Sequence, residues 1–187
     1  MRIEPLADYR HRIAEIAALL HAEWGDLAPW AVQADIERRF AGQLHTAQAP
    51  FTLVALADSG ELLGTASVKL FELPDHPDKV HWLGEVFIPR ERRGQGIGSA
   101  LVRACIAQSR ALGLPALYLY TPDQQALYAR FGWQEIAGAV VNGEEVSIMV
   151  LGMAQATSIK AAEPNQAEVP AHGIPPGDAA NWNLRLA

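Results

Sequence analysis

Apolar positions recur along the first 152 residues with two different spacings, which predict helices and strands in turn. Residues 11–23 carry apolar side chains every three or four positions, and this spacing predicts a helix. A break that contains Gly25 and Pro29 follows, and a second helix is expected over residues 30–44. The helical spacing returns over residues 97–112 and predicts another helix there.

Short runs rich in β-branched and aromatic residues predict the strands of a sheet. They cover residues 51–57, 62–71, 82–89, 114–120, 133–141 and 145–151. Residues 2–6 are expected to form an edge strand, because Pro5 is tolerated at an edge. The segment 58–61 and the pair Asn142–Gly143 predict hairpin turns. Together these elements predict an α/β fold with a mixed, mostly antiparallel central sheet of about seven strands flanked by about four helices.

Composition and charge favour a globular domain and argue against nucleic-acid-binding and membrane-spanning proteins. The chain has 187 residues, 50% of them hydrophobic, which suits one globular domain. Cys105 is its only cysteine, so no intrachain disulfide forms, and we expect a packing role for it in a reducing compartment. A net charge of −6 argues against a nucleic-acid partner and mildly favours cationic acceptors. No segment looks long enough to span a membrane, so we expect a cytoplasmic protein.

The composition changes near residue 154, where prolines and alanines become frequent. We therefore predict a domain over residues 1–152 and a Pro/Ala-rich C-terminal tail over residues 153–187. The tail is expected either to be mobile or to dock through Trp182, Leu184 and Leu186 on the domain or on a partner.

A glycine-rich segment stands between the strand at 82–89 and the helix that begins near Ile97. Residues 92–99 read Arg-Arg-Gly-Gln-Gly-Ile-Gly-Ser, and glycines at this position let backbone N–H groups converge at the positive end of a helix. The segment therefore predicts a phosphate-bearing ligand. A P-loop would need a lysine that is absent, and Ser99 replaces the third glycine of a dinucleotide fingerprint.

Two motifs in this order resemble the GNAT superfamily of N-acetyltransferases. Arg93, Gly96 and Gly98 form the R-x-x-G-x-G pattern of its acyl-CoA pyrophosphate loop, and residues 126–133 resemble its second signature, a short helix with Tyr128. The resemblance covers about residues 1–152. It implies the GNAT fold and acetyl-CoA as co-substrate. Many relatives have asparagine and alanine where this chain has Thr121 and Gln124.

The resemblance also implies roles for individual residues. Tyr128 matches the tyrosine that protonates the departing thiolate, although an aromatic at this position also packs a helix on a sheet. Glu85, inside an apolar strand, is either the general base or a carboxylate that is solvated or paired with a cation. The cofactor-binding residues expected from the motifs are Val86, Phe87, Ile88, Arg93, Gly94, Gln95, Gly96, Ile97, Gly98, Ser99, Thr121 and Gln124.

The acceptor is expected to lie between the break at residues 24–30 and the hairpin at Asn142–Gly143. Trp24, Asp26 and Trp30 would suit an amine with an apolar group, and the same tryptophans could instead fasten the first helices to the core. The six histidines show no recognised metal spacing, so we expect no metal.

The leading hypothesis is an acetyl-CoA-dependent N-acetyltransferase acting on an amine of a small molecule or peptide by direct attack in a ternary complex. The alternatives are a non-catalytic acyl-CoA-binding sensor or interaction module, and a protein lysine or N-terminal acetyltransferase. The sequence leaves the acceptor and a homodimer open.

Overall fold

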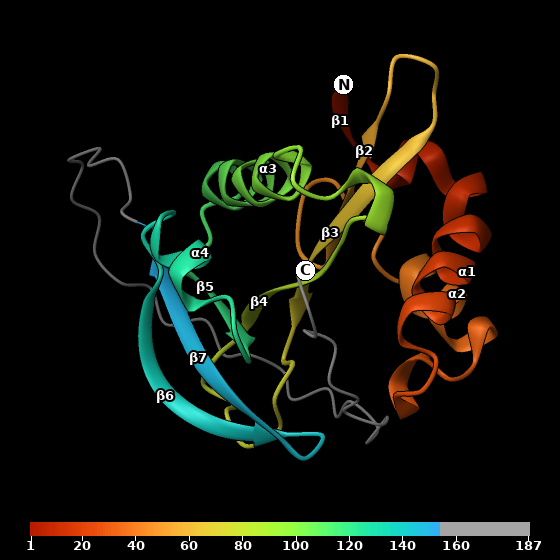
Figure 1. Cartoon of the computed structure of the whole chain (residues 1–187). Helices are drawn as coiled ribbons and strands as arrows, with labels where there is room; N and C mark the ends of the chain where they lie inside the picture. Colours follow the sequence, from red (N-terminus) through yellow and green to blue (C-terminus); the bar gives the residue numbers. More distant parts are fainter. Residues whose placement is uncertain (154–187) are drawn as a thin grey trace, which may run out of the picture.

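The computed structural model describes residues 1–153, and these fold around one seven-stranded sheet in the order β1-β2-β3-β4-β5-β7-β6 (Figure 1). Every neighbouring pair is antiparallel except β4 and β5, which are parallel. The mixed, mostly antiparallel sheet expected from the sequence is therefore confirmed. The strands are β1 (Arg2–Pro5), β2 (Phe51–Leu56), β3 (Leu62–Leu70), β4 (His81–Phe87), β5 (Ala116–Thr121), β6 (Gln134–Val141) and β7 (Glu144–Gly152).

Four α-helices accompany the sheet in the described part of the chain: α1 (Ile13–Trp24), α2 (Gln33–Ala41), α3 (Ile97–Ala111) and α4 (Gln125–Ala129). Short 3₁₀ segments cover Leu6–Arg12, Ala28–Trp30 and Arg90–Arg92. The expectation of one helix over residues 30–44 was too long at both ends. Pro29 lies in the first turn of the 3₁₀ segment, Val32 is extended, and α2 ends before Gly42.

The helices cover both faces of the sheet. Along β2, Leu53 and Ala55 face one hydrophobic cluster with α3, whereas Val54 and Leu56 face a second cluster with α1 and α2. Figure 1 shows α1 and α2 together on one side of the sheet, with α3 and α4 on the other. Both faces of the central strands are thus buried, which explains their nearly continuous apolar sequences.

Strand β4 is distorted in its second half, next to the glycine-rich segment. The register between β3 and β4 shifts between Thr65 and Ser67, and Glu85 has a φ of 53°. The Thr65 hydroxyl donates a hydrogen bond of 3.1 Å to the Glu85 carbonyl and holds this bulge. The ladder between β4 and β5 aligns Trp82 with Tyr118, and no later residue of β4 is paired with β5 in the described structure. The strand end that leads to the loop is therefore released from one neighbour.

Within residues 1–153, no helix is both long and apolar enough to cross a membrane. The C-terminal tail predicted from composition lies outside the described residues, apart from Met153.

Candidate functional site

The glycine-rich segment links the end of β4 to the start of α3 and adopts the backbone that its glycines permit. Gly94 and Gly96 have φ angles of 73° and 79°, in the left-handed region that other residues rarely adopt. Gly96 is the N-cap of α3 and makes no side-chain capping bond. A Cβ atom built on either glycine would meet no atom within 4 Å, so their backbone faces open space. The segment fits an approaching phosphate group.

This loop borders a cavity of about 300 Å³ at the N-terminal end of α3. The cavity brings together the loop, the end of β4 and helix α4, which are distant in the sequence. Its lining residues are Ile88, Arg92, Arg93, Gly94, Gly96, Ile97, Gly98, Ser99, Gln124 and Leu127. Arg92 and Leu127 were not among the residues expected from the motifs, although Arg92 stands beside the first of them in the sequence.

Four expected cofactor residues lie outside this lining. Val86 and Phe87 are buried on opposite faces of the sheet, Val86 with Tyr128 in one cluster and Phe87 in the other. The Gln95 side chain donates to the Glu91 carbonyl at 3.3 Å. The Thr121 hydroxyl accepts a hydrogen bond of 3.1 Å from the Gln124 backbone and steadies the start of α4.

The arginines beside the glycines are paired with carboxylates. Arg93 donates to the Ile88 carbonyl and to Glu23, each at 3.0 Å, and Arg90 donates twice to the same Glu23 at 3.1 and 3.3 Å. Burial opposes ionisation of Glu23, but the hydrogen bonds and charges of the two arginines outweigh it and hold the pKa of Glu23 below its ordinary value. Glu23 gave no signal in the sequence, because it is one polar position of an amphipathic helix.

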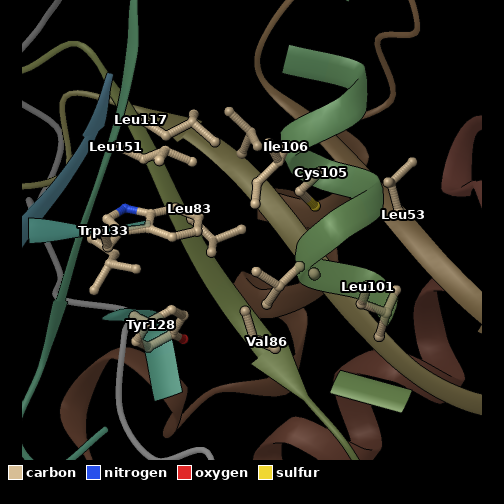
Figure 2. Packing of buried hydrophobic residues seen from close by; sticks show 14 of the residues in the cluster. Leu53, Leu83, Val86, Leu101, Cys105, Ile106, Leu117, Tyr128, Trp133 and Leu151 are labelled. Carbon is tan, nitrogen blue, oxygen red and sulfur yellow. The ribbon is translucent and has the colours of Figure 1, made fainter. Parts of the chain in front are cut away.

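Tyr128 is buried where α4 packs against the sheet. Its ring meets Trp133 edge-on, with centroids 5.6 Å apart, and Figure 2 shows its hydroxyl oxygen on the side of the ring that faces Val86. Burial, with a smaller contribution from Cys105, raises the pKa of Tyr128 well above that of a free phenol. The phenol is therefore protonated at neutral pH and able to donate a proton or hydrogen bond. The packing role and the acid role are compatible in this position.

Glu85 is paired with a cation inside the protein. Its side chain is 0% exposed, and its Oε1 accepts a hydrogen bond of 3.0 Å from Nε of Arg39, which is 15% exposed. The Arg39 guanidinium lies 4.6 Å from the centroid of the Trp30 ring. The second carboxylate oxygen, Oε2, has no hydrogen-bond partner among residues 1–153. One oxygen is thus held in place, and the other is unpaired but buried. Glu85 lines neither the cavity at the glycine-rich loop nor the cavity beside Trp24 and Asp26.

A second buried ion pair, Lys69–Glu72, interacts electrostatically with Glu85. Lys69 at the end of β3 donates to Glu72 at 2.6 Å, and both side chains are almost fully buried. Burial lowers the pKa of Lys69, and the charges of Glu72 and Glu85 oppose this shift. Arg39, Lys69 and Glu72 were not predicted from the sequence, although a lysine within a strand that contains no other charged residue is a signal that could have been followed.

The residues proposed for the acceptor fall into two places. A cavity of about 130 Å³ joins Trp24 and Asp26 to Asn142 and Glu144 of the hairpin, so the structure brings the two expected walls together. Trp30 does not line this cavity. It is fully buried, with its ring centroid 4.8 Å from that of Trp24, and packs in the core as the alternative interpretation of the tryptophans anticipated. Among residues 1–153, no three His, Cys, Asp or Glu side chains are grouped as metal ligands.

Comparisons with solved structures agree on the fold. A GNAT-family acetyltransferase from Streptococcus pneumoniae has 19% identity and a TM-score of 0.62, with 81% of this chain and 98% of that chain covered. An aminoglycoside 6'-N-acetyltransferase complexed with coenzyme A has 15% identity and a TM-score of 0.60, over 88% and 100% of the two chains. The spermidine/spermine N-acetyltransferase SpeG from Vibrio cholerae has 18% identity and a TM-score of 0.60, over 81% and 92%.

The sequence itself matches a family model. The model of the acetyltransferase (GNAT) family aligns with residues 12–133, which contain α1 to α4, the glycine-rich loop and Tyr128. The match covers more than half of the chain and includes both motifs that carried the resemblance. This protein therefore belongs to the GNAT family of acetyltransferases.

Proposed function

We propose that this chain transfers an acetyl group from acetyl-CoA to an amine of a small molecule or peptide, by direct attack in a ternary complex. The observation that carries the proposal is the cavity at the glycine-rich loop. It joins open backbone at the N-terminal end of α3 to the end of β4 and to α4, the helix that holds Tyr128. In this assignment residues 1–152 form the catalytic domain and residues 153–187 are an appended tail.

The loop is assigned to the pyrophosphate of the cofactor. Backbone N–H groups of residues 94–99 at the positive end of α3 would hold it, and Arg92 in the cavity wall adds a cation. The backbone of Val86–Ile88 would receive the pantetheine arm and supply a fixed N–H donor for the oxyanion, because this part of β4 is not paired with β5. Thr121 and Gln124 would lie beside the arm.

Glu85 and Tyr128 are assigned the two proton transfers. An alkyl amine with a pKa near 10.4 is neutral in only about one molecule in a thousand at pH 7, so a base must take its proton. Glu85 would take this proton on Oε2, directly or through water, as the amine nitrogen bonds to the acetyl carbon. As the carbon–sulfur bond breaks, the Tyr128 phenol donates its proton to the departing sulfur. Each group is expected to contribute about a hundred- to ten-thousand-fold.

The acceptor is assigned to the cavity between Trp24 and the hairpin. Asp26 and Glu144 in its lining favour a cationic amine, and Trp24 offers an aromatic wall. The cavity is small, which supports a small molecule or a single extended side chain. Aminoglycosides and spermidine are named as substrates of the similar structures, and they belong in the first set of acceptors to be tried.

The test measures release of free CoA thiol from acetyl-CoA with pools of amino acids, polyamines, aminoglycosides, aryl amines and short peptides. Release in one pool should fall about a hundredfold or more in Tyr128→Phe. Tyr118→Phe is the matched control, because Tyr118 of β5 packs against Trp82 of β4 and its replacement should leave the activity unchanged. Equal turnover in Tyr128→Phe would remove the acid role. If the protein binds CoA but no pool releases thiol, the result would favour a non-catalytic sensor or an enzyme that acetylates a folded protein.

A further inference from the structure

Glu23 ties three segments of the protein together with one carboxylate. It lies in the last turn of α1, and its Oε1 accepts hydrogen bonds from Arg93 at 3.0 Å and Arg90 at 3.3 Å. Its Oε2 accepts a third from Arg90 at 3.1 Å. Arg93 uses its Nε to reach the Ile88 carbonyl just after β4. Helix α1, the glycine-rich loop and the end of β4 are therefore joined through Glu23 and Arg93.

The Glu23–Arg93 contact is better shielded than the Arg92–Glu61 pair at the same loop. The side chains of Glu23 and Arg93 are 16% and 19% exposed. Arg92 pairs with Glu61 nearby, and those side chains are 38% and 49% exposed. Shielded, charge-assisted hydrogen bonds hold their partners in one geometry, whereas exposed pairs contribute little. The first residue of the R-x-x-G-x-G pattern is thus fixed by Glu23, whereas Arg92 is held less firmly in its exposed pair with Glu61.

We propose that Glu23 is a positioning residue of the cofactor loop, acting through Arg93 to hold the backbone of residues 93–98 in the conformation that receives the pyrophosphate. This inference rests on the proposed use of acetyl-CoA. Arg93 lines the loop cavity, whereas Glu23 lines the cavity assigned to the acceptor. Glu23 itself therefore acts from outside the phosphate site, behind the loop.

The direction in which Glu23→Gln changes the CoA affinity distinguishes a positioning role from a purely electrostatic effect. CoA is a polyanion, so removing a negative charge near its site would by itself tighten binding. A positioning role predicts the opposite, because the loop loses its preformed geometry and the ligand must order it. We expect the Kd of CoA, measured by titration calorimetry, to rise about tenfold in Glu23→Gln. We expect the KM for acetyl-CoA to rise by a similar factor, because the same loop binds both ligands.

Glu61→Gln is the matched control. It removes the same charge from the exposed pair at the same loop, and it should leave the CoA Kd unchanged or lower it. Arg90→Met removes the other partner of Glu23 but leaves the Glu23–Arg93 contact, so it should keep CoA affinity within about twofold. If Glu23→Gln does not fold, Arg93→Lys, which keeps the charge but cannot reach both Glu23 and Ile88, should raise the Kd in its place.

The outcomes distinguish this inference from the function on which it rests. If the unmodified protein does not bind CoA, the proposed function fails. If it binds CoA and Glu23→Gln binds equally well or more tightly, with urea midpoints showing that the variant is folded, the positioning role alone is overturned.

Discussion

Replacing Arg39 with methionine would leave the Glu85 carboxylate buried without the cation that now holds it. The Glu85 side chain is 0% exposed, and Nε of Arg39 contacts its Oε1 at 3.0 Å. Removing the hydrogen-bonded partner from a buried ion pair costs about 3–5 kcal/mol, because the remaining charge is not solvated. Lys69 also interacts with the charge of Glu85, so we expect a loss near the lower end of this range. Methionine keeps an unbranched apolar stem that can still pack near Trp30, so the loss reports mainly on the charge.

Urea unfolding followed by circular dichroism measures this cost. With a urea dependence of about 2 kcal/mol per molar, a loss of about 3 kcal/mol lowers the unfolding midpoint by about 1.5 M. The double variant Arg39→Met/Glu85→Gln removes both charges and should recover more than about half of the loss.

Arg38→Met is the matched control on the same helix. Arg38 pairs with Asp35 at 2.9 Å, but the two side chains are 76% and 53% exposed, so the expected loss is about 0–1 kcal/mol. Equal losses in Arg38→Met and Arg39→Met, or no recovery in the double variant, would refute the conclusion that Arg39 compensates a buried charge.

Four other changes test separate parts of the structure. Leu101→Ala, at a fully buried position of α3, should lower the unfolding free energy by about 2–5 kcal/mol in urea titrations, and a loss below about 1 kcal/mol would contradict its place in the core. Gly96→Ala puts a side chain at φ 79° and a methyl group in the open space before the loop, so we expect a loss of about 1–2 kcal/mol and a weaker CoA affinity in calorimetry. The pKa of Glu23 is held below its ordinary value of 4.5, so its ion pairs stabilise the fold above that range and are lost as the pH falls through the lowered pKa. The stability difference between the unmodified protein and Glu23→Gln should therefore be present near pH 7 and shrink as the pH falls below 4.5 through the lowered pKa, and a constant difference would exclude this linkage. Glu85→Gln should lower turnover most at low pH, where the amine is hardest to deprotonate, and an unchanged pH–rate profile would remove Glu85 from the mechanism.

Much of the fold was predictable because its signals are local. Short runs rich in β-branched and aromatic residues predicted strands at 51–57 and 62–71, and the structure has them at Phe51–Leu56 and Leu62–Leu70. The hairpin at Asn142–Gly143 is confirmed, with φ angles of 52° and 79° at the two positions. The start of α2 was predicted too early. Residues 28–30 form a 3₁₀ turn and Val32 is extended, so the α-helix begins only at Gln33.

The candidate site also has one part that the sequence predicted and one part that only the fold revealed. The sequence by itself determined that a glycine-rich loop with Arg93 lies between a strand and a helix, that a tyrosine motif follows, and that the family is GNAT, because these are contiguous patterns. Only the tertiary structure decided which charges meet. Glu23 contacts Arg93 across 70 positions, and Arg39 contacts Glu85 across 46, because α1 and α2 pack beside the distorted end of β4. Nothing in the local sequence specifies such pairs, since a charged residue on a helix is solvated until another segment buries it.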